Sequence, residues 1–528
     1  MTVADHVLAR RYGDAGPAAP SSPWRTPLDA LDWFAVSQGD APFVTAVAPD
    51  GTATTLDYRT AAVASRALAG WLCAEFGTGR PAALGFAPSN DVPSVLTVLA
   101  VLRAGFGLLM LGPSDPPERR ARQLEAAGAL ATVHLPGTGA PGPDSRALPH
   151  WTELPEPTAA LPALDPAADA LYFATSGSTA ASKLVAQTHL NAVANAEAVR
   201  RHHGLVRDDR VLACLPIHHV NGLHFTVLGT MAAGAHTVLC DSFSPLAYPG
   251  TLRTYRPRIA SVVPGILEAL VETWRRPELP SDFGYFVSAA APLTSRTARS
   301  VAERLGARVL QGYGLSETTN FSCTMPPGLS DDTYRGLMLD AEIPSVGVAV
   351  YGNEVAVLDP AGAPLPPGEV GEVCMRGFNV MSRYVRNAEA TREAFRDGWF
   401  HSQDLGYRVE RDGRGFFVLT GRLKNIAKVA GETVSLDEMD RVLRALPQVR
   451  DAACVTVPDR FAGEKIIAAV VLSGGETDAA ALTGPLRATF AEGVLPAQVI
   501  TLPSIPRTAT GKVLRPQLRD DLSARVRD

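Results

Sequence analysis

The chain has 528 residues, of which 46% are hydrophobic and 20% charged, and its formal net charge is -5. This length exceeds that of one ordinary domain, and the composition is typical of a globular protein with a large core, which excludes a mainly disordered chain. The slight acidity excludes a general affinity for nucleic acid or for anionic membranes.

The cysteines and the N-terminal region indicate a compartment. Six cysteines are scattered without a C-x-x-C pair, which argues against a disulfide framework or a zinc site. Residues 1–16 contain no apolar stretch of the kind that marks a secretory signal. The most apolar run, residues 95–111, is interrupted by Arg103 and two glycines, so it predicts a buried helix and a strand rather than a membrane span. We therefore expect a cytoplasmic protein with no membrane partner.

Strand-like and helical stretches alternate through the middle of the chain. Residues 170–175 and 258–263 have strand character, and each precedes a stretch of helical spacing, at residues 191–203 and 265–275. This alternation predicts βαβ units and mostly parallel sheets. Two later strands, 354–358 and 369–375, are joined by a Pro/Gly turn and predict a more antiparallel part.

The last hundred residues predict a small α+β unit after a break at residues 421–425. Ser435 and Glu438 have the spacing of a capping box, which predicts a helix that begins there and ends near Leu446. The predicted elements after it are strands 452–457 and 465–472 and a helix over 478–492.

A loop rich in hydroxyl groups directly follows the strand at 170–175. It reads Thr175-Ser-Gly-Ser-Thr-Ala-Ala-Ser-Lys183. Backbone N–H groups and hydroxyls of such a loop can donate to phosphate oxygens while the lysine supplies positive charge. The Walker A pattern is absent. Taken alone, the loop has the alternative interpretation of a polar surface turn.

Three further runs carry groups that suit a nucleotide. In Gly312-Tyr-Gly-Leu-Ser-Glu-Thr-Thr319, two glycines flank an aromatic ring and Glu317 is free to hold magnesium. In Gly398-Trp-Phe-His-Ser-Gln-Asp404, the final carboxylate can accept two hydrogen bonds from a ribose diol. Near the C-terminus, Lys512 follows a Thr-Gly turn, and the alternative for it alone is a solvated tail.

Together these runs resemble the adenylate-forming superfamily, in particular its acyl-CoA synthetases. The resemblance covers about residues 31–515 and includes Leu215-Pro-Ile-His-His-Val-Asn-Gly222, Ser288-Ala-Ala-Ala-Pro-Leu293, Ser345-Val-Gly347 and Gly368-Glu-Val-Gly-Glu372. It implies a multi-domain α/β fold. We expect an N-terminal domain (1–424) of two α/β lobes plus a β-barrel-like subdomain, and a mobile C-terminal α+β domain (425–528) with its hinge at Asn425, where many members carry Asp or Lys.

The resemblance implies an enzyme that activates a carboxylic acid with Mg²⁺ and ATP and then passes the acyl group to a thiol, most simply coenzyme A. The residues expected to bind the nucleotide are Thr175, Ser176, Gly177, Ser178, Thr179, Lys183, Ala290, Gly312, Tyr313, Asp404 and Arg422, with Glu317 for the metal. Lys512 is expected to bridge the carboxylate and the α-phosphate in the first step and to swing away for the second. Gly431 is expected along the pantetheine channel.

The acid is expected to meet His218, His219, Asn221 and Gly314, with His219 at the wall between the acyl pocket and the approach of the thiol. Polar groups at His218 and Asn221 favour a small, aryl or otherwise functionalised acid over a long alkyl chain. The alternative is that these side chains face the protein interior and select nothing.

Several residues depart from the family pattern. Ala180 and Leu184 replace glycines of the phosphate loop, Ser182 replaces its proline, and Gln403 replaces the glycine that usually precedes the ribose-binding aspartate. Weaker ATP binding is one possible result, because alanine at a position of positive φ costs roughly 1 kcal/mol. Two other functions stay open. One is adenylation with another acceptor (a carrier-protein phosphopantetheine in trans, an amine or an oxoacid such as nitrite), and the other is a degenerate relative that binds nucleotide without turnover.

Overall fold

A computed structural model describes residues 21–78, 82–142, 144–175, 183–429, 431–474, 479–508, 511–523 and 525. The described residues form two compact units. The larger unit runs to residue 355 and includes Met375–His401, and the smaller comprises Ala356–Cys374 and the residues from 402 onward. Strands β17 (Gly371–Gly377) and β20 (Trp399–Arg411) contribute residues to both units. The division expected between residues 424 and 425 stays a prediction.

The first sheet of the larger unit has nine strands in the order β15-β14-β13-β12-β11-β9-β10-β1-β2. Their bounds are β1 (Pro42–Val47), β2 (Ala53–Asp57), β9 (Arg210–Ala213), β10 (His236–Cys240), β11 (Ile259–Val262), β12 (Tyr285–Ser288), β13 (Arg308–Gly314), β14 (Phe321–Thr324) and β15 (Val348–Ala349). The six strands from β13 to β1 run parallel, and the remaining pairs at the two edges are antiparallel. The apolar run of β11 is fully buried, as parallel strands require.

A second sheet of seven strands has the order β18-β8-β7-β4-β3-β5-β6. Its strands are β3 (Ala83–Phe86), β4 (Gly107–Met110), β5 (Ala129–His134), β6 (Ser145–Ala147), β7 (Asp169–Ala174), β8 (Leu184–Thr188) and β18 (Arg383–Tyr384). β7 pairs parallel with β4 but antiparallel with β8, so the loop from 175 to 183 joins two neighbouring strands. The apolar run at residues 95–111 supplies most of helix α4 (Val92–Arg103) and then strand β4, as predicted.

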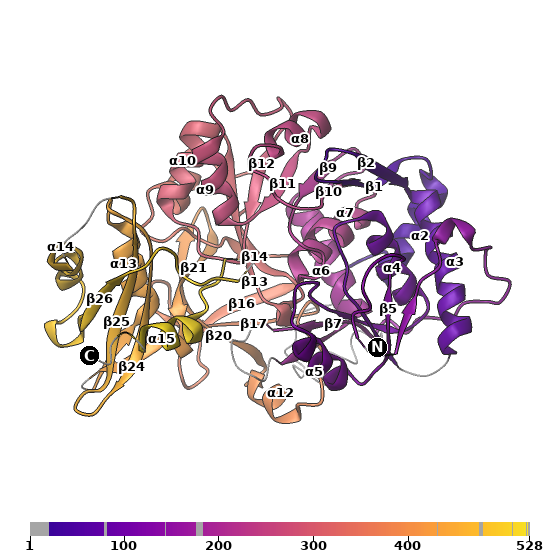
Figure 1. Ribbon diagram of the computed structural model, residues 1–528. Helices are drawn as coiled ribbons and strands as arrows, with labels where there is room; N and C mark the ends of the chain where they lie inside the picture. Colours follow the sequence, from indigo (N-terminus) through magenta and orange to yellow (C-terminus); the bar gives the residue numbers. More distant parts are fainter. Residues whose placement is uncertain are drawn as a thin grey trace. The chain divides into compact units, whose positions relative to one another are not determined.

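Helices flank these sheets, and Figure 1 shows α9 and α10 beside β11 and β12. The helices of the larger unit, besides α4, are α2 (Pro27–Ser37), α3 (Tyr58–Phe76), α5 (Pro117–Ala127), α6 (His189–His202), α7 (Gly229–Ala232), α8 (Tyr248–Tyr255), α9 (Pro264–Thr273), α10 (Ser295–Leu305), α11 (Asp331–Tyr334) and α12 (Ala388–Ala394), with short helical turns η2 (Trp151–Glu153), η3 (Asn221–Leu228), η4 (Ser316–Thr318) and η5 (Arg335–Leu339). α6 begins where Thr188 accepts a hydrogen bond from the Asn191 N–H. The helices predicted over 191–203 and 265–275 are present as α6 and α9.

A third sheet, expected to be barrel-like, has five strands in the order β16-β17-β20-β19, with β21 paired to β20. Its remaining strands are β16 (Asn353–Leu358), β19 (Phe395–Arg396) and β21 (Arg414–Arg422). β20 pairs antiparallel with both β19 and β21, so the more antiparallel part predicted before residue 421 is present.

The smaller unit ends in a sheet of order β23-β22-β25-β24, with β26 beside β25. Its elements are η6 (Leu423–Asn425), β22 (Ile426–Val429), β23 (Glu432–Ser435), α13 (Leu436–Ala445), β24 (Val449–Asp459), β25 (Gly463–Leu472), α14 (Ala479–Thr483), η7 (Pro485–Ala488), η8 (Glu492–Val494), β26 (Gln498–Thr501) and α15 (Arg515–Ser523). Ser435 accepts a hydrogen bond from the Glu438 N–H and caps α13 as predicted. The single helix predicted over 478–492 is wrong, because Gly484 and Pro485 divide it into short turns.

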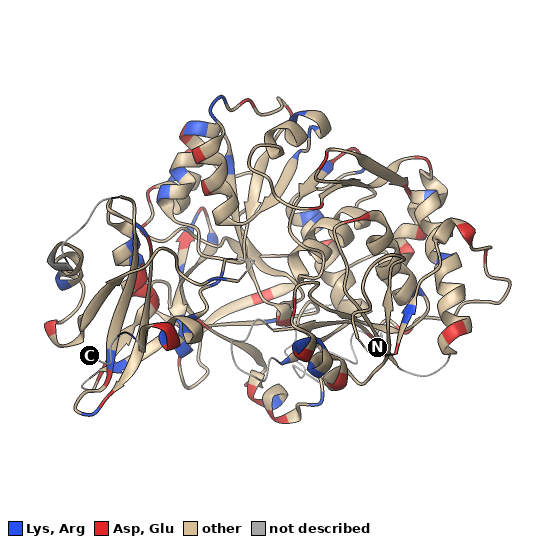
Figure 2. Ribbon diagram, viewed as in Figure 1, with Lys and Arg blue, Asp and Glu red and all other residues tan. Residues whose placement is uncertain are grey.

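The predicted fold class is confirmed: a mixed α/β protein with a large N-terminal part and a smaller C-terminal one. Figure 2 shows acidic and basic residues interspersed along the ribbon. No helix among the described residues is both long and apolar enough to cross a membrane.

All six cysteines are free thiols, five of them buried and Cys73 partly buried. Burial raises the pKa of five thiols, that of Cys240 to about 12; they are Cys73, Cys214, Cys240, Cys323 and Cys454. Those thiols are therefore protonated at neutral pH and weak nucleophiles.

Candidate active site

Glu317 is held in place by a tyrosine from another strand. It lies in η4, which follows β13 closely, and Tyr384 Oη of β18 donates a hydrogen bond to Glu317 Oε1 at 2.8 Å. Burial and the neighbouring Glu317 charge raise the pKa of Tyr384, so the phenol stays protonated and keeps donating. Among the described residues, Glu317 Oε2 accepts no hydrogen bond. A carboxylate oriented through one oxygen with the other available fits magnesium, which binds through oxygen.

Lys183 lies against the same tyrosine. Its Nζ is 4.7 Å from the centroid of the Tyr384 ring, within the range of a cation–π interaction. The Thr175 N–H donates to the Lys183 carbonyl at 2.8 Å, and the Lys183 N–H donates to Thr175 Oγ1 at 3.2 Å. The two ends of the predicted phosphate loop are thus joined, and its cation lies beside the ring that orients Glu317. Ser176, Gly177, Ser178 and Thr179, with the departures Ala180 and Ser182, lie outside the described residues.

The two glycines around Tyr313 are required by the packing of β14 on β13. A Cβ added at Gly314 would lie 1.6 Å from the Asn320 carbonyl oxygen, and one at Gly312 would lie 2.7 Å from the Phe321 ring. No side chain fits at Gly314 without moving the backbone. Tyr313 between them is 7% exposed. The glycines therefore fix the path of the strand that carries the predicted adenine-binding tyrosine.

Ala290, also predicted near adenine, has a strained backbone. It lies two residues beyond β12 with a φ of +70°. Residues with a Cβ disfavour this left-handed region by roughly 1–2 kcal/mol. Such strain persists where surrounding structure imposes it, often at functional sites.

Asp404 and Arg422, the predicted ribose pair, face each other across the β20–β21 hairpin. They are direct partners in the strand register, and Arg422 Nε lies 2.8 Å from Asp404 Oδ1. The Asp404 residue is 4% exposed. A largely buried carboxylate paired with a cation on one side is oriented to accept further hydrogen bonds from hydroxyl groups.

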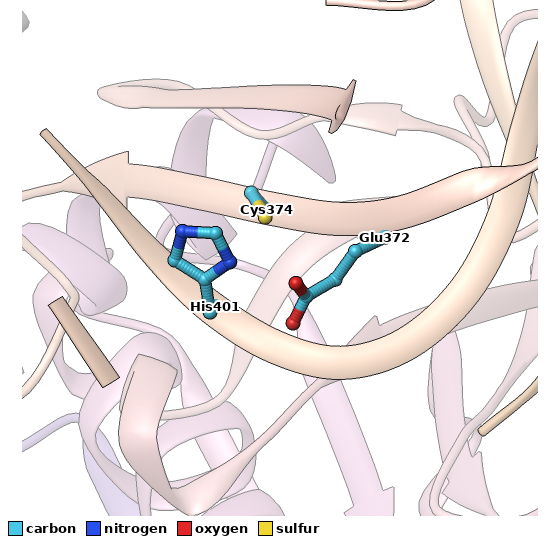
Figure 3. A group of neighbouring side chains, drawn as sticks. All are labelled: Glu372, Cys374 and His401. Atoms are coloured by element: carbon cyan, nitrogen blue, oxygen red, sulfur yellow. The ribbon is translucent and has the colours of Figure 1, made fainter. Parts of the chain in front are cut away.

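Gln403, where the resemblance leads us to expect glycine, has a left-handed backbone conformation that glycine adopts readily. Its φ is +62°, and its N–H donates at 2.8 Å to Glu372 Oε1. Figure 3 shows Glu372 and Cys374 projecting from β17 and His401 from β20. These three residue types can bind metals. The Glu372 carboxylate accepts the Gln403 N–H, so we assign it to shaping the bend before Asp404.

Lys512 lies in a turn whose backbone is closely fixed. The Thr508 N–H donates to the Lys512 carbonyl at 2.8 Å, and the Lys512 N–H donates to Thr508 Oγ1 at 3.1 Å. Gly511 has a φ of +84°, and Arg507 Nη1 donates to its carbonyl at 2.6 Å. The lysine thus extends from an anchored turn rather than a solvated tail. Gly431, with a φ of +87°, lies just before β23.

Three of the four residues predicted to meet the acid, His218, His219 and Asn221, lie around the start of η3, and the fourth, Gly314, is the last residue of β13. The rings of His218 and His219 are 4.3 Å apart. Burial lowers the pKa of His218 to about 4, so it is neutral at pH 7. Asn221 is 9% exposed and accepts a hydrogen bond from Ser261 Oγ at 3.0 Å. Asn221 is thus held by the protein interior, whereas the two histidines are partly exposed.

The predicted residues fall into two sets. Among the described residues, Thr175 and those from Lys183 to Glu317 belong to the larger unit, and Asp404, Arg422, Gly431 and Lys512 belong to the smaller one. The sequence did not reveal two positioning residues. Tyr384 orients Glu317, and Glu372 accepts the Gln403 N–H at the bend before Asp404. Tyr384 lies 67 residues from its partner, and no motif drew attention to it.

The fold and these residue sets define an enzyme class that uses ATP to activate acids. Residues 31–385 match the family described as AMP-binding enzyme, and residues 438–512 match its C-terminal domain. The chain therefore belongs to the AMP-binding enzymes, the adenylate-forming superfamily, and is of the acyl-CoA synthetase type. The prediction of an AMP-forming acid–thiol ligase is confirmed at this level.

Individual relatives agree with this assignment. A sulfoacetate–CoA ligase of Cupriavidus necator is 34% identical over 380 residues, which cover 71% of this chain and 72% of that protein. The crystal structure of ATP-bound MatB from Rhodopseudomonas palustris has a TM-score of 0.81 and 26% identity, covering 93% of this chain and 98% of that one. The amide bond synthetase McbA from Marinactinospora thermotolerans has a TM-score of 0.79 and 27% identity, covering 93% and 99%.

Proposed function

We propose that this protein uses Mg·ATP to convert a small or aryl carboxylic acid into an acyl-adenylate with release of pyrophosphate, and then transfers the acyl group to coenzyme A with release of AMP. The observation that carries the proposal is the joint support of Glu317 and Lys183 by Tyr384. Tyr384 thus holds a carboxylate that can bind magnesium and an ammonium that can bind phosphate, and the triphosphate of Mg·ATP would need both groups.

The chemistry of the first step is mainly electrostatic. The carboxylate attacks the α-phosphorus and the bond to the pyrophosphate oxygen breaks, so anions must approach each other and negative charge must be stabilised. Bound magnesium would supply a charge that offsets that of the phosphates. Glu317 would hold the metal, and Lys183 would lie against the β- and γ-phosphates.

Asp404 would act at the ribose of the nucleotide and Lys512 at its α-phosphate. The Asp404 carboxylate, oriented by Arg422, would accept hydrogen bonds from the ribose hydroxyls. The Lys512 ammonium would lie between the carboxylate of the acid and the α-phosphate. Placing a fixed cation where charge develops lowers the barrier without reorganisation in the transition state.

For the second step the thiol sulfur forms a bond to the acyl carbon and the bond to AMP breaks. Gly431 carries no side chain, and a Cβ added there would meet nothing within 4 Å. This is consistent with a narrow arm such as pantetheine passing along it. His219 would separate the acid from the approaching thiol.

Polar groups around η3 favour an acid with a second polar group or an aromatic ring. The neutral His218 beside His219 offers ring nitrogens and flat faces, and neither matches a long alkyl chain. The sulfoacetate–CoA ligase among the relatives supports a small functionalised acid. Similarity to an amide bond synthetase supports the second candidate, in which an amine replaces coenzyme A.

The test is acid-dependent exchange of labelled pyrophosphate into ATP, with panels of short difunctional, aryl and long-chain acids. Exchange with short or aryl acids supports the proposal, and exchange with long-chain acids alone would contradict the substrate class. No exchange with any acid would favour the degenerate relative. AMP release is then compared with coenzyme A, an amine, nitrite or a phosphopantetheinylated carrier as acceptor.

A further inference from the structure

Asp437 ties together three separate segments of the smaller unit. It is the second residue of α13, and its Oδ2 accepts a hydrogen bond from the Arg422 backbone N–H at 3.0 Å. Asn425 Nδ2 donates to both of its carboxylate oxygens, at 3.1 and 3.0 Å. Arg515 Nη2 donates to Asp437 Oδ1 at 2.8 Å. One carboxylate therefore binds the end of β21, the predicted hinge residue and the start of α15.

Arg515 is anchored on α13 by more than this bond. Its Nη2 also donates to Asp440 Oδ2 at 2.5 Å, and the Asp440 side chain is 1% exposed. Asp440 in turn accepts from the Cys454 N–H. Ion pairs this well buried hold their geometry closely, because separating them leaves an uncompensated charge. The segment three residues after Lys512 is thus fixed to α13, so that α13 and the lysine turn move together.

The bond from the Arg422 N–H differs from the others in its position along the chain. Arg422 precedes the predicted hinge at Asn425, whereas Asp437 and Arg515 follow it. A turn of the backbone at Asn425 carries α13 away from the Arg422 N–H but leaves the contact between Asp437 and Arg515 intact. The hydrogen bond from Arg422 to Asp437 therefore belongs to one rotational state of the hinge.

We propose that Asp437 is a positioning residue that latches the hinge in one of the two conformations that the two-step reaction requires. This proposal rests on the proposed function, because only a two-step reaction calls for a turning hinge. The latch is a backbone hydrogen bond to a carboxylate, and such charge-assisted bonds are stronger than neutral ones. Asp437 is not among the residues expected to bind substrate or nucleotide, and it acts through the orientation of Arg422, Asn425 and Arg515.

The direct test is hydrogen exchange at the Arg422 amide in the whole protein without substrates. We expect D437A to accelerate exchange there by ~10-fold or more, since a charge-assisted hydrogen bond is lost. D437N, which keeps the side-chain shape, should give a smaller acceleration and serves if D437A does not fold. Glu492 forms an exposed ion pair with Arg487 in the same unit, so E492A is the matched control and should leave Arg422 unchanged.

The functional test compares the two half-reactions with and without the latch. We expect D437A to change the ratio of adenylate formation to thiol transfer by ~5-fold or more, with the KM for the acid unchanged. An equal change in both rates, or unaltered exchange at Arg422, would overturn the proposal. Absence of acid activation in the unmodified protein would instead overturn the proposed function, and the exchange result would still stand by itself.

Discussion

Tyr384 Oη donates a hydrogen bond to Glu317 Oε1 at 2.8 Å, and the same ring lies 4.7 Å from Lys183 Nζ. The edge strand β18 thus places the buried phenol of Tyr384 between the carboxylate of Glu317 and the ammonium of Lys183, which are far apart in sequence. The pair gives a distinct experimental handle, because the hydroxyl and the ring can be removed separately.

We expect Y384F to lower kcat/KM for ATP by ~10-fold and to raise the magnesium concentration needed for half-maximal pyrophosphate exchange, because Glu317 loses its orienting donor. Y384L should lose more, since the cation–π contact with Lys183 also disappears. The buried Tyr248 hydroxyl makes no hydrogen bond among the described residues, so Y248F is the matched control. An unchanged magnesium requirement in Y384F would contradict the role.

Lys512 should act in the first step only. We expect K512A to lower adenylate formation by ~10²–10³-fold, as loss of one preorganised charge does in other enzymes, while transfer from supplied adenylate stays nearly intact. K512R should restore little, because a planar fork does not replace a compact ammonium. K465A, on strand β25, is the control. Equal losses in both half-reactions would rule out the assignment.

Gln403 should destabilise the protein slightly. Replacing it with glycine relieves a φ of +62°, and we expect Q403G to raise the free energy of unfolding by ~1 kcal/mol. Because Glu372 still receives the N–H at position 403, the KM for ATP should change little. Urea unfolding and initial-rate kinetics measure both quantities. A fall in stability would show that the Gln403 side chain contributes more than its backbone strain costs.

Buried histidines should make stability fall in mild acid. Burial lowers the pKa of His189, His218 and His236 to about 4 and that of His224 to about 3. The unfolded chain takes up protons near its ordinary histidine pKa of about 6.5 while the folded one does not. Stability is therefore full above about pH 7 and falls as the pH drops toward 4.

Urea unfolding at pH 7 and pH 5 checks this pH dependence. In H236Q the difference in unfolding free energy between the two pH values should be smaller than in the unmodified protein. The exposed His150 supplies a control, and H150Q should leave the difference unchanged. Equal stability of the unmodified protein at both pH values would contradict the prediction.

The sequence predicted what depends on local pattern. The apolar run of β11, the Ser435 cap and the α4–β4 succession all follow from periodicity, turn residues and capping within a few positions. The resemblance predicted a glycine where Gln403 stands, and the positive φ of this residue explains why glycine would fit there. The helix over 478–492 was overextended although Gly484 and Pro485 carried the signal that breaks it.

What the sequence could not predict are contacts between distant segments. Asp437 meets Arg515 across 78 residues, and Glu317 meets Tyr384 across 67. Neither pairing has a spacing rule, because each depends on how complete sheets and helices pack. The roles of the remaining predicted site residues stay predictions until the experiments above are made.

The state of the cysteines has a practical use in the assay of coenzyme A. Chromogenic disulfide reagents are attacked by thiolates, and the five thiols with raised pKa would give them little to react with. Coenzyme A is a small, solvated thiol that reacts readily. The sixth thiol, Cys374, is buried as well. The consumption of coenzyme A can therefore be followed by colour in the presence of the folded enzyme.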